Sequence, residues 1–241
     1  MRMEYIYFKN RFVKKADARV SIDDRAFRFG DGVFETLLVA NGKLYDAKRH
    51  FQRLQDGLTH LNIAFSLPDL SALCTELIER NALQAGYVRL IISRGEMTAD
   101  AMGYAPSTHS EPYLVAQTVA RPLPALRPLR LWVSEQRAAM HLRSKTNSAL
   151  LYVLAMQEAQ ANDCDNALIL DSEGNICETA SGNLFWVKDN VLYTPATTLP
   201  FVPGTVRRKV LEWSPYPVEE GIYGLEQLRA ADEVFMTNIG T

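Results

Sequence analysis

Ser-Lys-Thr-Asn-Ser at residues 144–148 leads into an apolar helical pattern, and Ile-Cys-Glu-Thr-Ala-Ser-Gly-Asn-Leu-Phe-Trp at residues 176–186 follows it. Between them the sequence predicts a strand at Ala167–Asp171 and a Ser-Glu-Gly-Asn turn. A lysine amine freed of its charge by desolvation or by a nearby cation becomes a nucleophile and forms a Schiff base with a carbonyl. The order lysine, helix, strand, turn and glutamate therefore indicates carbonyl chemistry at Lys145, with Glu178 as its acid.

Two further segments offer groups that bind phosphate. Pro203-Gly-Thr-Val-Arg207 predicts a helix to about Trp213, and a glycine before a helix leaves free amides at the positive end of its dipole. Asp46 is expected to cap a helix over Ala47–Leu61, and Arg53 lies at the flank of its apolar stripe. From the pattern alone Arg53 is a solvated helix arginine, although a guanidinium also suits a phosphate dianion.

The lysine-to-glutamate order, with His-Phe-Gln-Arg-Leu-Gln at 50–55, resembles the class IV aminotransferases, a family that uses pyridoxal 5'-phosphate. The resemblance covers nearly the whole chain. It implies an α/β fold of two domains, like that of D-amino acid aminotransferase, with the cofactor in the cleft between them. The cofactor needs a lysine, a carboxylate at its ring nitrogen and a phosphate cup.

The resemblance assigns roles to individual residues. Lys145 would hold the cofactor covalently and then move a proton, while Glu178 would face the pyridine nitrogen. The remaining cofactor contacts are expected from the phosphate-binding Arg53, Thr205 and Val206, and from Ser181 and Asn183 along the cofactor's side.

Within this family the chain most resembles the aminodeoxychorismate lyases, which convert 4-amino-4-deoxychorismate to 4-aminobenzoate and pyruvate for folate biosynthesis. An aminotransferase acting on D- or branched-chain amino acids is the alternative within the family. A catalytically silent, binding-only relative is a third interpretation, but Lys145, Glu178 and Arg53 are all present.

Thr36, in Gly32-Val-Phe-Glu-Thr, separates lyase from aminotransferase. The lyases resemble this chain in having threonine there, whereas branched-chain aminotransferases usually have glycine and D-amino acid aminotransferases a small apolar residue. Loss of the enolpyruvate group needs a proton donor besides the lysine, and a hydroxyl can serve. The competing interpretation is a threonine selected for its strand propensity.

The chain departs from the family pattern at three places. Relatives usually have Lys-x-Leu-Asn where this chain has Lys145-Thr-Asn-Ser, and often Gly-Ile-Thr-Arg where it has Gly204-Thr-Val-Arg. Lyases often have Arg-Gly-Tyr where it has Met102-Gly-Tyr104. These changes affect a hydroxyl contact to phosphate and a contact to a substrate carboxylate, while backbone contacts are expected to persist.

The sequence predicts an N-terminal α/β domain at 1–118, a proline-rich linker at 119–128 and a cofactor-binding domain at 129–241. Pro68–Gln84 is expected to be a helix ended by Gly86, and residues 95–111 a long loop. Gly30-Asp-Gly32 lacks the third glycine and the following helix of a dinucleotide-binding fingerprint, so a Rossmann fold is excluded.

Composition narrows the class of protein further. The 241 residues carry a net charge of −2 with scattered basic residues, which argues against nucleic-acid binding. With no apolar run long enough for a membrane span and no signal-peptide pattern, a cytoplasmic protein is expected. Three separated cysteines and four histidines without ligand spacing predict neither a disulfide framework nor a metal site. The family resemblance adds a small-molecule substrate and a homodimer.

Overall fold

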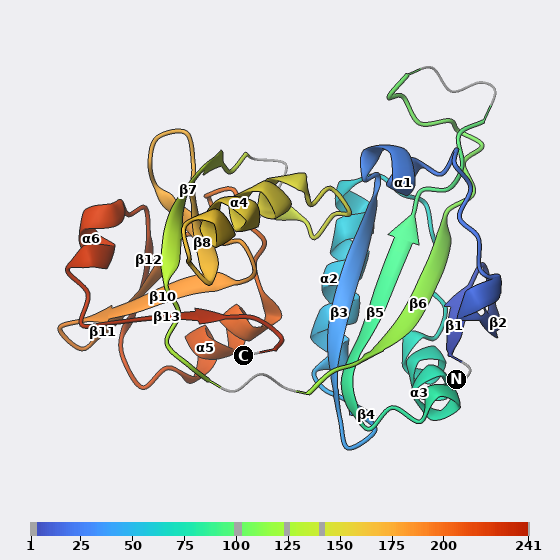
Figure 1. Ribbon diagram of the computed structural model, residues 1–241, viewed down its shortest axis with the longest axis horizontal. Helices are drawn as coiled ribbons and strands as arrows, with labels where there is room; N and C mark the ends of the chain where they lie inside the picture. The colour runs from blue at the N-terminus through green and yellow to red at the C-terminus, as the bar shows by residue number, and fades with distance from the viewer. Residues whose placement is uncertain (1–3, 99–102, 123–125, 140–142, 241) are drawn as a thin grey trace. The chain divides into compact units, whose positions relative to one another are not determined.

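The computed structural model describes residues 4–98, 103–122, 126–139 and 143–240. The chain divides into two compact units (Figure 1). One comprises Met1–Leu123 with Lys145–Ser148, and the other comprises Pro124–Ser144 with Ala149–Thr241. This division differs from the predicted domains in assigning the Lys145 segment to the first unit. Met102 lies outside the described residues, and no helix within them is long and apolar enough to cross a membrane.

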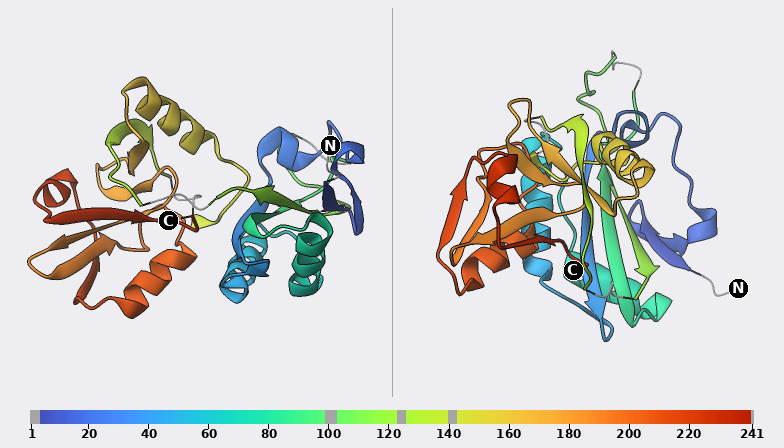
Figure 2. Two further views of the ribbon diagram at one scale, coloured as in Figure 1. Left: turned by 60° about the horizontal axis from the view of Figure 1, so that its bottom comes forward. Right: turned by 60° about the vertical axis from the view of Figure 1, so that its left-hand side comes forward.

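The described part of the first unit forms an antiparallel sheet in the order β2-β1-β6-β5-β3-β4. Helices α2 and α3 lie side by side on one of its faces (Figure 2). The elements are β1 (Tyr5–Phe8), β2 (Arg11–Lys14), η1 (Lys15–Asp17), α1 (Arg25–Phe29), β3 (Gly32–Ala40), β4 (Lys43–Leu44), α2 (Ala47–His60), α3 (Leu70–Asn81), β5 (Ala85–Ser93) and β6 (Tyr113–Ala120).

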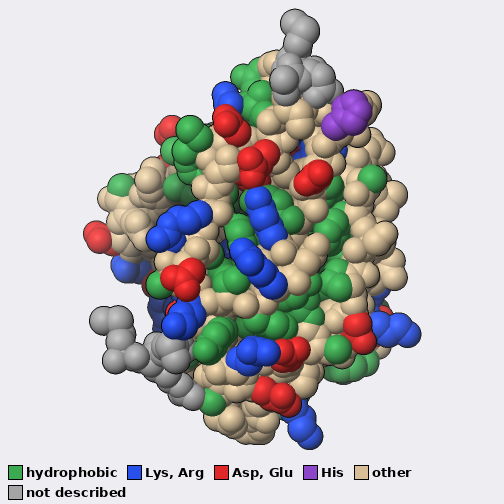
Figure 3. All heavy atoms as spheres, turned by 90° about the vertical axis from the view of Figure 1, so that its right-hand side faces the viewer, with side chains coloured by type: hydrophobic (Ala, Val, Ile, Leu, Met, Phe, Trp, Pro, Cys, Tyr) green, Lys and Arg blue, Asp and Glu red, His purple; other side chains and the backbone are tan. Residues whose placement is uncertain are grey.

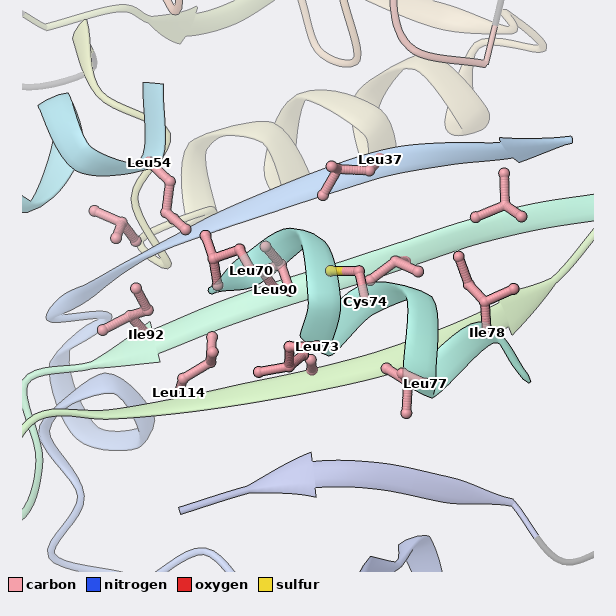
Figure 4. Close-up of a cluster of buried hydrophobic side chains, with 14 of the residues drawn as sticks. Leu37, Leu54, Leu70, Leu73, Cys74, Leu77, Ile78, Leu90, Ile92 and Leu114 are labelled. Carbon is pink, nitrogen blue, oxygen red and sulfur yellow. The ribbon is translucent and has the colours of Figure 1, made fainter. Parts of the chain in front are cut away.

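Alternation along β3 places its two sets of side chains in different surroundings. Val33, Leu37 and Val39 are buried in the core cluster shared with the helices, whereas Phe34, Thr36 and Leu38 are only partly buried. The predicted apolar residues of α3 complete this core around Cys74, as Figure 4 shows. Burial of such a stripe, more than helix propensity, stabilises a helix of this length.

Three predicted boundaries are wrong for local reasons. Helix α3 is shorter than Pro68–Gln84 because Asp69 caps it and Ala82 ends it in a left-handed conformation, with φ 45°. Gly86 lies inside β5 at φ 141°. Asp46 is itself left-handed and makes no capping hydrogen bond to α2; its carboxylate pairs with Arg49 at 3.5 Å.

The described part of the second unit contains two sheets, in the orders β12-β11-β10-β13 and β7-β8-β9. The predicted hairpin at Asp189-Asn190 is confirmed, since both residues have positive φ between β10 and β11. The elements are β7 (Leu131–Arg137), α4 (Leu150–Ala161), β8 (Asn166–Leu170), β9 (Ile176–Thr179), β10 (Asn183–Lys188), β11 (Val191–Pro195), α5 (Thr205–Trp213), β12 (Val218–Gly221), α6 (Leu225–Arg229) and β13 (Glu233–Thr237).

Acidic and basic side chains are interspersed on the molecular face drawn in Figure 3. The basic residues there do not merge into one continuous field. This distribution agrees with the net charge of −2 and gives a polyanion no extended basic surface on this face.

We predict that the three thiols react in two classes. Burial raises the pKa of Cys74 to about 12, and burial with the charges of Asp171 and Glu178 raises that of Cys177 to about 12. Only Cys164 is partly exposed. Titration with a disulfide reagent should therefore modify Cys164 in the native protein and the other two only on unfolding. Rapid modification of Cys74 in the native Cys164→Ala variant would contradict this packing.

Candidate active site

Lys145 is held on the open edge of β3. Strand β4 pairs only with the end of β3, at Val39 and Ala40, which leaves the beginning of β3 without a neighbouring strand on that side among the described elements. Residues 145–147 occupy this edge: the Phe34 amide donates to the Lys145 carbonyl, and the Asn147 amide donates to the Gly32 carbonyl, both at 2.9 Å. A strand of the first unit thereby fixes the backbone of the candidate nucleophile.

The predicted direct junction of Lys145 with a helix is therefore wrong. Helix α4 begins only at Leu150, because backbone pairing with β3 keeps the preceding residues extended. Gly30 and Gly32 permit this pairing. A Cβ at Gly30, where φ is 70°, would collide with Ser148, and one at Gly32 would collide with the Ile92 carbonyl and the Asn147 side chain.

The Lys145 amine lies 4.4 Å from the centroid of the Phe34 ring. Thr36 is two residues further along β3, so its side chain projects from the same strand face as Phe34. Arg89, which is opposite Thr36 on β5, places its guanidinium 4.9 Å from the same ring. The first unit thus brings two cations, an aromatic ring and a hydroxyl to one sheet face.

Arg89 is a candidate that the sequence analysis missed. It is exposed, and it has no carboxylate within ion-pair distance among the described residues. A polar residue amid the apolar alternation of β5 was the available indication, but strand arginines are usually solvated. Its position beside Thr36 makes it suited to bind an anionic substrate group.

Arg53 is bound by a buried carboxylate of β3. Its Nε and Nη2 donate to the two oxygens of Glu35 at 2.6 and 2.9 Å, and His50 Nδ1 lies 2.7 Å from Glu35 Oε2. Burial alone would raise the pKa of Glu35, but the hydrogen bonds and charges of His50 and Arg53 hold it below its ordinary value. The Arg53 side chain remains 19% exposed, so an anion can reach the oriented guanidinium.

In the second unit, Glu178 lies on β9 and is 5% exposed. The Tyr152 hydroxyl, from the first turn of α4, donates to Glu178 Oε1 at 2.7 Å. The carboxylate is thus desolvated and held by a neutral donor, which suits a cationic group such as a protonated pyridine nitrogen.

The start of α5 is held by Asn183. The Asn183 amide donates to the Val202 carbonyl at 2.9 Å, and its oxygen accepts the Gly204 amide at 2.9 Å. Thr205 is the first residue of α5 and is buried, and Val206 follows it, so their amides form the start of the helix. Ser181 accepts a hydrogen bond from Asn166 at 2.7 Å, in the turn before β10.

Thr237 adds an unexpected polar group near this helix start. It pairs with Asn183 across β10 and β13, and neighbouring residues in such a pair have adjacent side chains. Its buried Oγ1 has no hydrogen-bond partner among the described residues. Orphaned hydroxyls are costly, so a bound group with acceptor atoms is expected here.

The sequence matches the family described as Amino-transferase class IV over residues 32–241. This chain belongs to that family. It is 32% identical to an aminodeoxychorismate lyase of Vibrio harveyi, over 91% of this chain and 83% of that protein. Its fold matches the branched-chain amino acid aminotransferase of Escherichia coli with a TM-score of 0.91 and 27% identity, over 99% of this chain and 84% of that chain.

Class IV enzymes use pyridoxal 5'-phosphate, as the sequence analysis predicted. A second branched-chain aminotransferase, from T.th. and solved with pyridoxamine 5'-phosphate, matches with a TM-score of 0.89 at 26% identity, over 100% of this chain and 84% of that one. The residues present fit this cofactor: the second unit offers a buried carboxylate and an amide-lined helix start beside an orphaned hydroxyl, and the first offers a lysine and an oriented arginine.

We predict that Lys145 carries the cofactor covalently. Borohydride reduction of the holoprotein should fix the cofactor to the peptide that contains Lys145, because hydride converts a Schiff base to a stable amine. Peptide mapping checks this. Lys43→Ala, at an exposed position of β4, is the matched control and should label normally. Labelling of Lys145→Ala together with full turnover would reject the assignment.

We predict that Glu35→Gln destabilises the protein by about 3 kcal/mol, since it leaves a mostly buried arginine unpaired. The pKa of Glu35 is lowered in the fold, so its stabilisation is present above its ordinary value of 4.5 and is lost as pH falls through the lowered pKa. Urea unfolding of the apoprotein from pH 3 to 7 should show this acid loss in the parent only.

Cofactor binding should weaken about tenfold in Glu35→Gln, because the guanidinium of Arg53 loses its orientation. Glu76→Gln is the matched control, since Glu76 pairs with Arg80 on an exposed helix face and should cost little. If both variants behave alike, Glu35 does not organise the phosphate contact of Arg53.

Proposed function

We propose that the protein is a pyridoxal-phosphate-dependent lyase that converts 4-amino-4-deoxychorismate to 4-aminobenzoate and pyruvate. The observation that supports this choice is Thr36, whose hydroxyl projects from the strand face on which Lys145 meets Phe34. The identity to the Vibrio harveyi lyase is consistent with the proposal.

The proposed reaction removes one proton from the substrate ring and adds one to the departing enolpyruvate. The Lys145 amine takes the ring proton, and the Thr36 hydroxyl, directly or through water, supplies the other. Arg89 holds a substrate carboxylate close to Thr36. The bound cofactor supplies the electron sink that stabilises charge at the deprotonated carbon.

The proposed cofactor contacts draw on both units. Glu178 keeps the ring nitrogen protonated, while Ser181 and Asn183 line the cofactor's side. Arg53 and the amides of Thr205 and Val206 bind its phosphate.

An aminotransferase is the second candidate, and the fold match to the Escherichia coli branched-chain enzyme favours it. Lysine, carboxylate and phosphate contacts serve both reactions equally. The substrate-facing groups Thr36 and Arg89 therefore carry the distinction. A keto acid formed from a panel of D- and L-amino acids, without 4-aminobenzoate from aminodeoxychorismate, would favour this alternative.

We also propose that the protein acts as a homodimer. Leu150, Val153 and Leu154 form an apolar stripe on α4 and are 68%, 50% and 37% exposed. A partner subunit covering these side chains would remove apolar surface from water.

We predict that Thr36→Val lowers lyase turnover about 10²-fold, because it retains the shape of the side chain and removes the proton donor. Thr36→Ser is the matched control and should retain most turnover, since it keeps the hydroxyl. Production of 4-aminobenzoate measures both. Unchanged turnover in Thr36→Val, with no aminotransferase activity gained in Thr36→Gly, would make Thr36 a strand residue without a chemical role.

A further inference from the structure

Tyr152 and Glu178 are joined across two elements that are distant in the sequence. Tyr152 lies in the first turn of α4, and Glu178 lies on β9. The hydroxyl–carboxylate distance is 2.7 Å, which is the length of a strong hydrogen bond to a charged acceptor. The contact involves one oxygen of the carboxylate, Oε1.

The surroundings make this contact specific. The Tyr152 ring packs against the apolar cluster that contains Ala155 and Ile169, and Glu178 pairs with Ile169 across β8 and β9. The helix and the strand therefore fix the donor and the acceptor independently. In such a desolvated setting a hydrogen bond to an anion is stronger than it is in water.

The protonation states of the neighbouring groups leave Tyr152 as a donor. Burial, with the charge of and hydrogen bond to Glu178, raises the pKa of Tyr152 far above its ordinary value. Burial, with the charges of Asp171 and Glu178, raises the pKa of Cys177 to about 12. The phenol and the thiol beside the carboxylate therefore both stay neutral at physiological pH.

We propose that Tyr152 is a positioning residue that fixes the Glu178 carboxylate and sets how firmly it holds the ring proton of bound pyridoxal phosphate. This inference rests on the proposed role of Glu178 at the ring nitrogen. The hydroxyl draws negative charge from the carboxylate, so the shared proton stays on the ring. Without the hydroxyl the proton moves toward Glu178, and the ring loses the positive charge that makes it an electron sink.

The test compares Tyr152→Phe with Tyr193→Phe in holoprotein reconstituted with pyridoxal phosphate. Both changes remove one hydroxyl and retain the ring, and Tyr193 stacks on Trp186 in the same unit without a side-chain hydrogen bond among the described residues. Tyr152→Phe should shift the absorption maximum of the bound cofactor at constant pH and lower turnover about tenfold. Tyr193→Phe should change neither.

A double-mutant cycle with Glu178→Gln separates this inference from the proposed function. Glu178→Gln alone should lower turnover about 10²–10⁴-fold, and adding Tyr152→Phe should then have almost no further effect. If Glu178→Gln changes neither spectrum nor turnover, the proposed role of Glu178 fails. If Glu178→Gln is impaired but Tyr152→Phe matches Tyr193→Phe, only the inference about Tyr152 fails.

Thermal unfolding of the apoproteins distinguishes positioning from packing. A merely structural Tyr152 would lower the unfolding temperature, and with it cofactor affinity, while leaving the spectrum of the bound cofactor unchanged. That result, or strictly additive effects of the two substitutions, would overturn the inference. A spectral shift in Tyr152→Phe that Glu178→Gln abolishes supports it.

Discussion

The backbone pairing of residues 145–147 with the open edge of β3 is the constraint on which the first unit's chemistry depends. A lysine side chain is long and flexible, and its placement over Phe34 would otherwise require ordering of a surface loop at a large entropic cost. Two backbone hydrogen bonds to a strand that is itself paired along its whole length with β5 make that ordering part of folding. Gly30 and Gly32 permit the approach. The glycine pair that fails as a nucleotide-binding motif thus has a structural role at the candidate nucleophile.

Most of the fold was predictable because its determinants are local. Alternation along β3, the stripe of α3 and the Asn41-Gly42 and Asp189-Asn190 turns each depend on a few neighbouring residues. The errors occurred where a tertiary contact overrides such a pattern. Residues 145–147 have helix-forming neighbours, but a strand far away in the sequence holds them extended.

The candidate site shows the same limit. The family pattern pointed to Lys145 and Glu178, yet their partners Phe34 and Tyr152 carry no local signature, because a ring or a hydroxyl looks ordinary until another element meets it. Glu35 was partly accessible: His50 and Arg53 are one helical turn apart, and an acid at a core position of a strand needs cations.

The pairing of residues 145–147 has a consequence beyond chemistry. A strand edge with unpaired amides and carbonyls is a template for association with other chains, and proteins normally cover or interrupt such edges. The beginning of β3, which runs through Gly32, Val33 and Phe34, would be an edge of this kind without its neighbour. The segment that presents the candidate nucleophile therefore also shields the sheet from aggregation. Selection for solubility and selection for activity act on the same few residues.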